Sequence, residues 1–197
     1  RRTIKMKAIQ IRRLIMGKIL IPLADGFEEI EAVTNIDVLR RAGLDVITAG
    51  IGSKKIRGDH GINVETDTEI SEVSADDLSA VVLPGGMPGA ANLRDSAELL
   101  KLIRAVNEKD GLCAAVCAAP IVLEAAGILE SKNATSYPGF GDQMQSANYQ
   151  EERVVIDGNI ITGRGPGVAM EFALTIVEYL LDGKERVELE KAMLVKK

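Results

Sequence analysis

The stretch LCAAVCAAP, residues 112–120, joins a short apolar run to a cysteine and a proline. The run at 112–116 is typical of a strand buried in a parallel sheet, and Pro120 suits the first turn of a helix, where its missing N–H costs nothing. Cys117 therefore lies at a predicted strand-to-helix turn, where small neighbours allow the sharp bend that exposes a nucleophile. The start of a helix also lowers the pKa of a thiol. We predict that Cys117 is a reactive thiolate; the alternative is the buried, inert state that we expect for Cys113.

Apolar runs and helical patterns alternate on both sides of this stretch. Such alternation predicts an α/β fold with a mostly parallel central sheet and helices on both of its faces. Asp157-Gly158 indicates a hairpin, and residues 131–152 lack periodicity, which is typical of a functional or mobile loop. Strands are expected at 18–23, 45–49, 80–83, 112–116, 153–156 and 159–162, and helices at about 28–42, 95–107, 120–126, from 166 and after 183.

In a sheet of this kind, functional residues lie beyond the carboxyl ends of the strands, which here are followed by residues 26–31, 84–89, 117–120 and 163–167. The first of these segments, GFEEIE, places three carboxylates in the first turn of a helix that carries Ile30, Val33, Ile36 and Leu39 on one face. Favourable interaction with the helix dipole is enough to explain Glu28 and Glu29. Glu31 would lie beside Cys117 if their strands are neighbours, and a carboxyl in that position has a raised pKa and can shuttle a proton.

The other candidate residues give weaker signals. The segment PGGMPG at 84–89 either offers backbone N–H groups to an oxyanion or only makes turns. Arg164, in GRGPG at 163–167, is either an anion-binding residue or a structural ion-pair partner. His60, the only histidine of the chain, is expected on the surface or at an interface. Two cysteines four residues apart are a poor disulfide pair, and no Cys/His cluster accompanies them, so we expect no metal and no cofactor.

Charge is distributed unevenly along the 197 residues. Residues 1–15 carry six basic residues and no acidic one, which leaves 18 basic against 29 acidic residues in the remainder. We expect residues 1–15 to be a basic extension outside the fold, with a transit peptide or a polybasic arm as alternatives, and residues 16–197 to form a single domain. An acidic body disfavours nucleic acid as the main partner. The absence of an apolar run of 18 residues argues against a membrane span, and the unpaired cysteines favour a cytoplasmic location.

Five motifs in a fixed order resemble those of the ThiJ/PfpI superfamily, in the branch of the parkinsonism-associated protein deglycase and its bacterial ThiJ-like relatives. The resemblance extends from about Gly17 to the C-terminus. It implies a flavodoxin-like three-layer sandwich and a homodimer. The motifs are DGFEEIE at 25–31, DVLRRAG at 37–43, VVLPGG at 81–86, AAVCAAP at 114–120 and RGPG at 164–167.

The resemblance also implies roles for individual residues. Cys117 would be the nucleophile and the site of oxidation, and Glu31 a protonated partner hydrogen-bonded to it. The backbone N–H groups of Gly86 and Ala118 would form an oxyanion pocket. Activities in the family include cofactor-independent glyoxalase, repair of glyoxal-modified protein groups, redox sensing and chaperone-like holding. The implied partner is a small α-oxoaldehyde or a glycated protein.

Two positions depart from related patterns. Tyr137, in SYPG at 136–139, stands where the deglycase has a histidine before a proline. A tyrosine hydroxyl can donate to an oxyanion, but at neutral pH it is a poor proton relay. Ala118 stands where the protease branch has a histidine, so we do not expect peptide hydrolysis. We therefore expect a glyoxalase or deglycase using Cys117, Glu31 and Tyr137, with a redox sensor or chaperone as the alternative. Thiazole monophosphate biosynthesis, a label carried by ThiJ-like relatives, is a further alternative.

Overall fold

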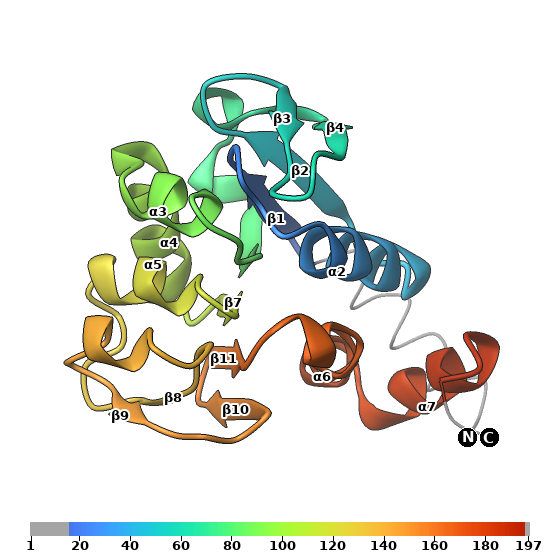
Figure 1. Ribbon diagram of the computed structural model, residues 1–197. Helices are drawn as coiled ribbons and strands as arrows, with labels where there is room; N and C mark the ends of the chain where they lie inside the picture. The colour runs from blue at the N-terminus through green and yellow to red at the C-terminus, as the bar shows by residue number, and fades with distance from the viewer. Residues whose placement is uncertain (1–15, 196–197) are drawn as a thin grey trace.

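The computed structural model describes residues 16–195 and contains a seven-stranded central sheet (Figure 1). The strand order is β10-β11-β7-β6-β1-β2-β5, and every neighbouring pair is parallel except the hairpin β10–β11. The predicted α/β class with a mostly parallel sheet is therefore confirmed. The strands are β1 (Lys18–Leu23), β2 (Val46–Gly50), β5 (Thr68–Glu69), β6 (Leu78–Leu83), β7 (Leu112–Val116), β10 (Val154–Asp157) and β11 (Ile160–Gly163).

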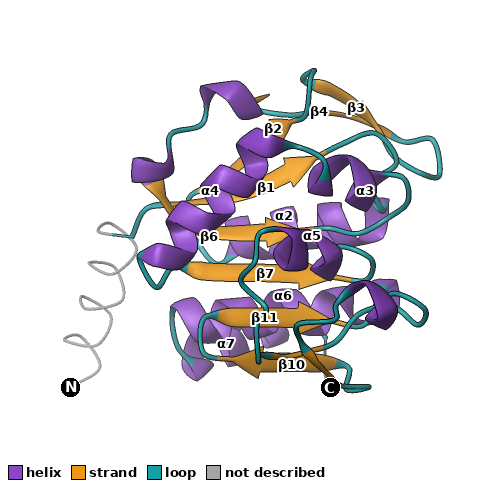
Figure 2. Ribbon diagram, turned by 90° about the vertical axis from the view of Figure 1, so that its left-hand side faces the viewer, coloured by secondary structure: helices purple, strands orange, loops and turns teal. Residues whose placement is uncertain are grey.

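Helices cover both faces of the sheet and make the fold a three-layer sandwich (Figures 1 and 2). One face is covered by α2 (Glu29–Arg41), α6 (Ala169–Leu180) and α7 (Gly183–Ala192). The other face is covered by α3 (Gly89–Arg94), α4 (Ala97–Glu108) and α5 (Pro120–Ala125). The sequence did not predict α3 as a separate helix, because its six residues are too few to carry a periodic pattern.

Strand β7 shows why the apolar runs are nearly continuous. Successive side chains of a strand point to opposite faces of the sheet. Leu112 and Val116 pack among residues of α2 and α6, whereas Cys113 packs among residues of α4 and α5. Both faces of β7 are fully buried, so no position favours a polar residue. The expectation that Cys113 is buried is confirmed.

Helix α2 does not bury the face that its apolar spacing suggests. Ile30 and Val33 are 58% and 48% exposed, while Glu29 and Glu31 are buried. Leu39, at the far end of the predicted face, is buried, and it packs into the core together with Val38. This orientation of the helix turns the two glutamates towards the ends of the strands. The predicted apolar face is therefore divided: Leu39 lies in the core, whereas Ile30 and Val33 form an exposed patch.

The segments expected to be irregular contain short ordered elements. The section expected to be irregular, at about 62–73, contains β4 (Asn63–Glu65) and a 3-10 turn at Ile70–Glu72. The strand β3 (Lys55–Arg57) precedes it, and a second 3-10 turn at Ala75–Asp77 follows it. The long loop contains the parallel pair β8 (Asn133–Ala134) and β9 (Asn148–Tyr149), with a 3-10 turn at Gly141–Gln143 between them. A further 3-10 turn, Pro166–Val168, precedes α6. The prediction for residues 1–15 falls outside the described part of the chain. None of the helices between residues 16 and 195 has the length and apolar character needed to cross a membrane.

Candidate active site around Cys117

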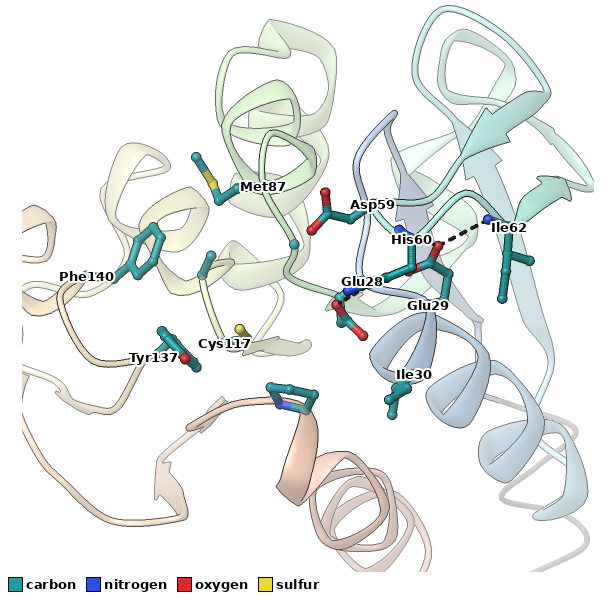
Figure 3. Close-up of a pocket in the computed structure, with 13 residues that line it drawn as sticks. Glu28, Glu29, Ile30, Asp59, His60, Ile62, Met87, Cys117, Tyr137 and Phe140 are labelled. Atoms are coloured by element: carbon teal, nitrogen blue, oxygen red, sulfur yellow. Dashed lines mark hydrogen bonds and ion pairs between the residues drawn. The ribbon is translucent and has the colours of Figure 1, made fainter.

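A pocket of about 630 Å³ opens at the carboxyl ends of the parallel strands (Figure 3). The segments that follow β1, β6, β7 and β11 all contribute to its wall, as the topology rule predicts. Cys117 faces the pocket between Tyr137 on one side and Glu28 on the other. The lining residues are Glu28, Glu29, Ile30, Asp59, His60, Ile62, Gly86, Met87, Cys117, Ala118, Tyr137, Phe140 and Pro166.

Cys117 occupies a strained backbone conformation. Its φ of 63° lies in the left-handed region, which costs a residue with a side chain on the order of 1–3 kcal/mol. Hydrogen bonds on both sides hold it there: its N–H donates to the carbonyl of Gly163 at 2.9 Å, and its carbonyl accepts from the N–H of Tyr137 at 2.8 Å. The bend confirms the predicted sharp turn after the strand, and it presents the sulfur to the pocket.

Glu31 approaches Cys117 from the neighbouring helix. Its side chain is fully buried, and one carboxyl oxygen accepts a hydrogen bond from the N–H of Gly85 at 2.7 Å. The carboxyl lies beside the Cys117 side chain, and its other oxygen, Oε1, is buried without a hydrogen-bond partner among the described residues. A Cβ at Gly85 would lie 2.8 Å from both the Glu31 oxygen and the Cys117 Cβ, so only glycine allows this approach. The sequence prediction that Glu31 lies beside Cys117 agrees with this geometry.

Burial raises the pKa of Glu31 to about 7. Burial also raises the pKa of the Cys117 thiol, and the neighbouring charge of Glu31 raises it further. The predicted lowering of this pKa is therefore wrong. The reason is that α5 begins only at Pro120, and the dipole of this six-residue helix cannot offset burial beside a carboxylate. Because the two groups interact, they lose their protons as a pair, and a thiolate forms at Cys117 when its proton passes to Glu31.

Backbone N–H groups face the sulfur, as the resemblance implies. The N–H groups of Ala118 and Gly86 lower the pKa of the Cys117 thiol, although by less than burial raises it. The same two groups could stabilise an oxygen anion formed on a ligand that is bonded to the sulfur. Gly86 has a φ of 90°, and a Cβ there would lie 2.4 Å from the backbone of Glu28. The turn of this segment therefore requires glycine.

Tyr137 and Arg164 differ in how they relate to the pocket. The half-exposed Tyr137 lines it. Arg164 does not line the pocket: its guanidinium donates to the backbone carbonyl of Glu151 and pairs with the Glu151 carboxylate at 3.5 Å. The structural ion-pair alternative for Arg164 thus describes its contacts, and the anion-binding alternative has no support among the described residues.

The sequence did not identify the polar rim of the pocket. His60 is exposed, as expected, but its Nδ1 lies 2.9 Å from Glu29 Oε2 and 3.5 Å from Glu28 Oε2 (Figure 3). Its hydrogen bond to Glu29 and the charge of Glu28 raise the pKa of His60. Burial acts to raise the pKa of Glu29, but hydrogen bonds from His60 and from backbone N–H groups outweigh it and lower this pKa. The sequence pattern indicated only the adjacent carboxylates Glu28 and Glu29. It did not connect them with His60, because His60 lies about 30 positions away in the sequence.

Comparison with known proteins assigns the chain to a family. A profile of the DJ-1/PfpI family matches residues 17–179. This chain belongs to the DJ-1/PfpI family. The expected superfamily membership is thereby confirmed.

Individual relatives agree with this assignment. The crystal structure of Drosophila melanogaster DJ-1beta superposes with a TM-score of 0.88 at 39% identity, covering 93% of this chain and all of that chain. The Caenorhabditis elegans protein named glutathione-independent glyoxalase DJR-1.2 is 36% identical over 85% of this chain and 89% of its own length. Arabidopsis thaliana DJ-1 homolog B is 40% identical over 91% of this chain, which spans only 42% of that protein. The flavodoxin-like fold expected for this DJ-1/PfpI protein is confirmed by these likenesses.

Proposed function

We propose that this DJ-1/PfpI protein is a cysteine-dependent, cofactor-independent enzyme of the glyoxalase and deglycase type. Its substrates would be α-oxoaldehydes such as methylglyoxal, or their adducts with protein amines and thiols. The observation that carries the proposal is the contact between the buried Glu31 carboxyl and the Cys117 sulfur, beside two backbone N–H groups. The name of the Caenorhabditis elegans relative, a glutathione-independent glyoxalase, supports the same activity.

In the first step, the Cys117 sulfur bonds to the aldehyde carbon while the thiol proton passes to Glu31. The carbonyl oxygen becomes an oxyanion, which the N–H groups of Gly86 and Ala118 stabilise. A pKa of about 7 suits Glu31 to both accept and return a proton near neutral pH. Apolar side chains such as Met87 and Phe140 line the pocket and strengthen these electrostatic interactions by excluding water.

The remaining steps need no external oxidant or reductant. A proton leaves the former aldehyde carbon and another is added to the adjacent ketone carbon, so that the first carbon is oxidised to a thioester and the second is reduced to an alcohol. Water then attacks the thioester, the carbon–sulfur bond breaks, and a 2-hydroxy acid leaves while Cys117 regains its proton. Glu31 is the buried group placed to carry these protons, and the Tyr137 hydroxyl is available as a hydrogen-bond donor.

The test is lactate release from methylglyoxal by the purified, reduced protein. We expect the Cys117→Ala variant to fall to the uncatalysed rate. Cys113→Ala is the matched control, since Cys113 is buried in the core outside the pocket, and it should keep most of the activity. Equal lactate release by the wild type and Cys117→Ala would exclude the proposal.

A second candidate function is redox sensing or chaperone-like holding through oxidation of Cys117. The observation that favours it is Tyr137 at the pocket wall, because a phenol is a weak proton relay at neutral pH. Gly86 and Ala118 would donate to the oxygens of a sulfinate as they would to an oxyanion. Mass spectrometry after mild peroxide treatment tests this function: an unoxidised Cys117 beside oxidised methionines would exclude it.

We also propose that the protein forms a homodimer. Ile30 and Val33 of α2 and the neighbouring pocket residue Ile62 are exposed together on one side of the fold. Large exposed apolar side chains gathered in this way are typical of an interaction surface. A symmetric dimer would cover the patch with the same patch of a second copy.

A further inference from the structure

We propose that Glu28, Glu29 and His60 form a binding site for a divalent transition-metal ion, Zn²⁺ being the best match, at the rim of the Cys117 pocket. Each residue offers one donor atom, and the three atoms lie within 4.8 Å of one another. Two carboxylate oxygens and one imidazole nitrogen are ligands that Zn²⁺ commonly takes in proteins. The site is separate from the sulfur of Cys117, and it does not depend on the proposed enzymatic activity.

The spacing of the donor atoms fits a shared ion. His60 Nδ1 lies 2.9 Å from Glu29 Oε2 and 3.5 Å from Glu28 Oε2. With metal–ligand distances of about 2.1 Å, two ligands of one ion are separated by roughly 3.0 Å at a right angle and roughly 3.4 Å in a tetrahedron. The two separations from His60 match these values, and the glutamate oxygens lie within 4.8 Å of each other. The metal would take the place of the Nδ1 proton, which is released to water.

The ligands are held in position before any ion binds. The other oxygen of Glu29, Oε1, accepts hydrogen bonds from the backbone N–H groups of His60 at 2.8 Å and Ile62 at 3.3 Å. These bonds fix the carboxylate and direct Oε2 towards the imidazole. Outer contacts of this kind orient metal ligands and raise the affinity of a site. The Glu29 and Glu28 side chains are only 6% and 12% exposed, so little water has to be displaced from them.

The charge balance at the rim also favours a divalent cation. Asp59 adds a third carboxylate to the lining, and no lysine or arginine is among the lining residues. A single imidazolium cannot neutralise three carboxylates, two of which are mostly buried. A dication bound to Glu28 and Glu29 would offset much of the cost of burying these charges. In Figure 3 the carboxyl of Glu28 points into the pocket, which leaves open coordination positions on that side.

The experiment is a Zn²⁺ titration of the reduced, tag-free full chain, followed by calorimetry and by nitrogen NMR of the imidazole. Because His60 is the only histidine, its two ring nitrogens give the only imidazole signals. We expect one Zn²⁺ per chain and a shift centred on Nδ1. His60→Asn and Glu28→Gln should each weaken binding at least tenfold. Glu98→Gln, which alters an exposed carboxylate on α4, should bind as the wild type does.

Cys117→Ser separates this site from one built on the thiol. It should retain Zn²⁺ binding and the Nδ1 shift. Loss of binding in Cys117→Ser, unchanged binding in both His60→Asn and Glu28→Gln, or no stoichiometric binding by the wild type would each overturn the proposal. His60 is exposed, and the ion pair of the Glu28 carboxylate is with His60, so both variants should fold, and their melting temperatures verify this.

Discussion

The Glu31 carboxyl lies beside the Cys117 side chain and is fully removed from water. This arrangement raises the pKa of Glu31 to about 7, because burial penalises its charged form more than the Gly85 N–H and Cys117 favour it. The acid therefore changes its charge in the pH range in which the protein is expected to act. Both stability and thiol reactivity should follow this titration.

Stability should fall as the pH rises from about 4.5 to about 7. In the unfolded chain Glu31 loses its proton near its ordinary value of 4.5, whereas the folded protein holds it until about 7, so unfolding releases a proton between these values. The penalty is absent below pH 4.5 and reaches about 3 kcal/mol above pH 7. Glu31→Gln removes it, so this variant should be more stable than the wild type at pH 8 and similar at pH 4. Urea unfolding at the two pH values measures the difference, and an equal difference at both would contradict it.

Alkylation of Cys117 should accelerate as the pH rises through about 7. Once Glu31 has lost its proton it can accept the proton of Cys117, so a minor population with a protonated Glu31 and a Cys117 thiolate grows as the pH rises to about 7. Rates of iodoacetamide modification, followed by mass spectrometry, should show an inflection near this pH. The inflection should be absent in Glu31→Gln. Cys113, buried and with a pKa raised to about 12, serves as the internal control and should stay unmodified.

Gly85→Ala should weaken the proposed activity without unfolding the protein. The new Cβ would lie 2.8 Å from the Glu31 oxygen and from the Cys117 Cβ, so the pair must separate. We expect at least a tenfold loss of kcat/KM and about 1–3 kcal/mol of destabilisation from overpacking. Gly167→Ala is the control, since a Cβ there meets no atom within 4 Å. Full activity in Gly85→Ala would show that the close approach of Glu31 is unnecessary.

Val33→Asp should convert a dimer to a monomer. An aspartate in the patch of Ile30, Val33 and Ile62 would bury an unpaired charge against its symmetric copy. Light scattering coupled to size-exclusion chromatography measures the change. Ile156→Asp alters an equally exposed apolar residue on the edge strand β10 and should leave the mass unchanged. A monomeric wild type would exclude the dimer.

The sequence predicted the features that depend on local pattern and topology. The strands 18–23 and 112–116 were predicted with the bounds that the structure gives, because both are buried on both faces and end at clear turns. Glu31 was expected beside Cys117 if β1 and β7 were neighbours. The structure places β6 between them, but both strands end at the same edge of the sheet, and the two residues still meet there.

The features that were missed depend on tertiary neighbours. The pKa of Cys117 is set by burial and by Glu31, which no local signal reports. His60 reaches Glu29 only because the segment after β3 folds back over the start of α2. The exposed face of α2 has the spacing of a core face, and periodicity alone does not distinguish a core from an interface.

Tyr137 should limit the rate of the proposed reaction. A phenol exchanges protons poorly at neutral pH, whereas an imidazole exchanges them readily. Tyr137→His should therefore raise kcat for methylglyoxal several-fold, while KM changes little because the ring still fills the pocket wall. Tyr137→Phe, the matched control, keeps the ring without the hydroxyl and should retain activity within a few-fold of the wild type. If Tyr137→Phe loses activity as completely as Cys117→Ala, the hydroxyl itself takes part in proton transfer, and Glu31 does not act alone.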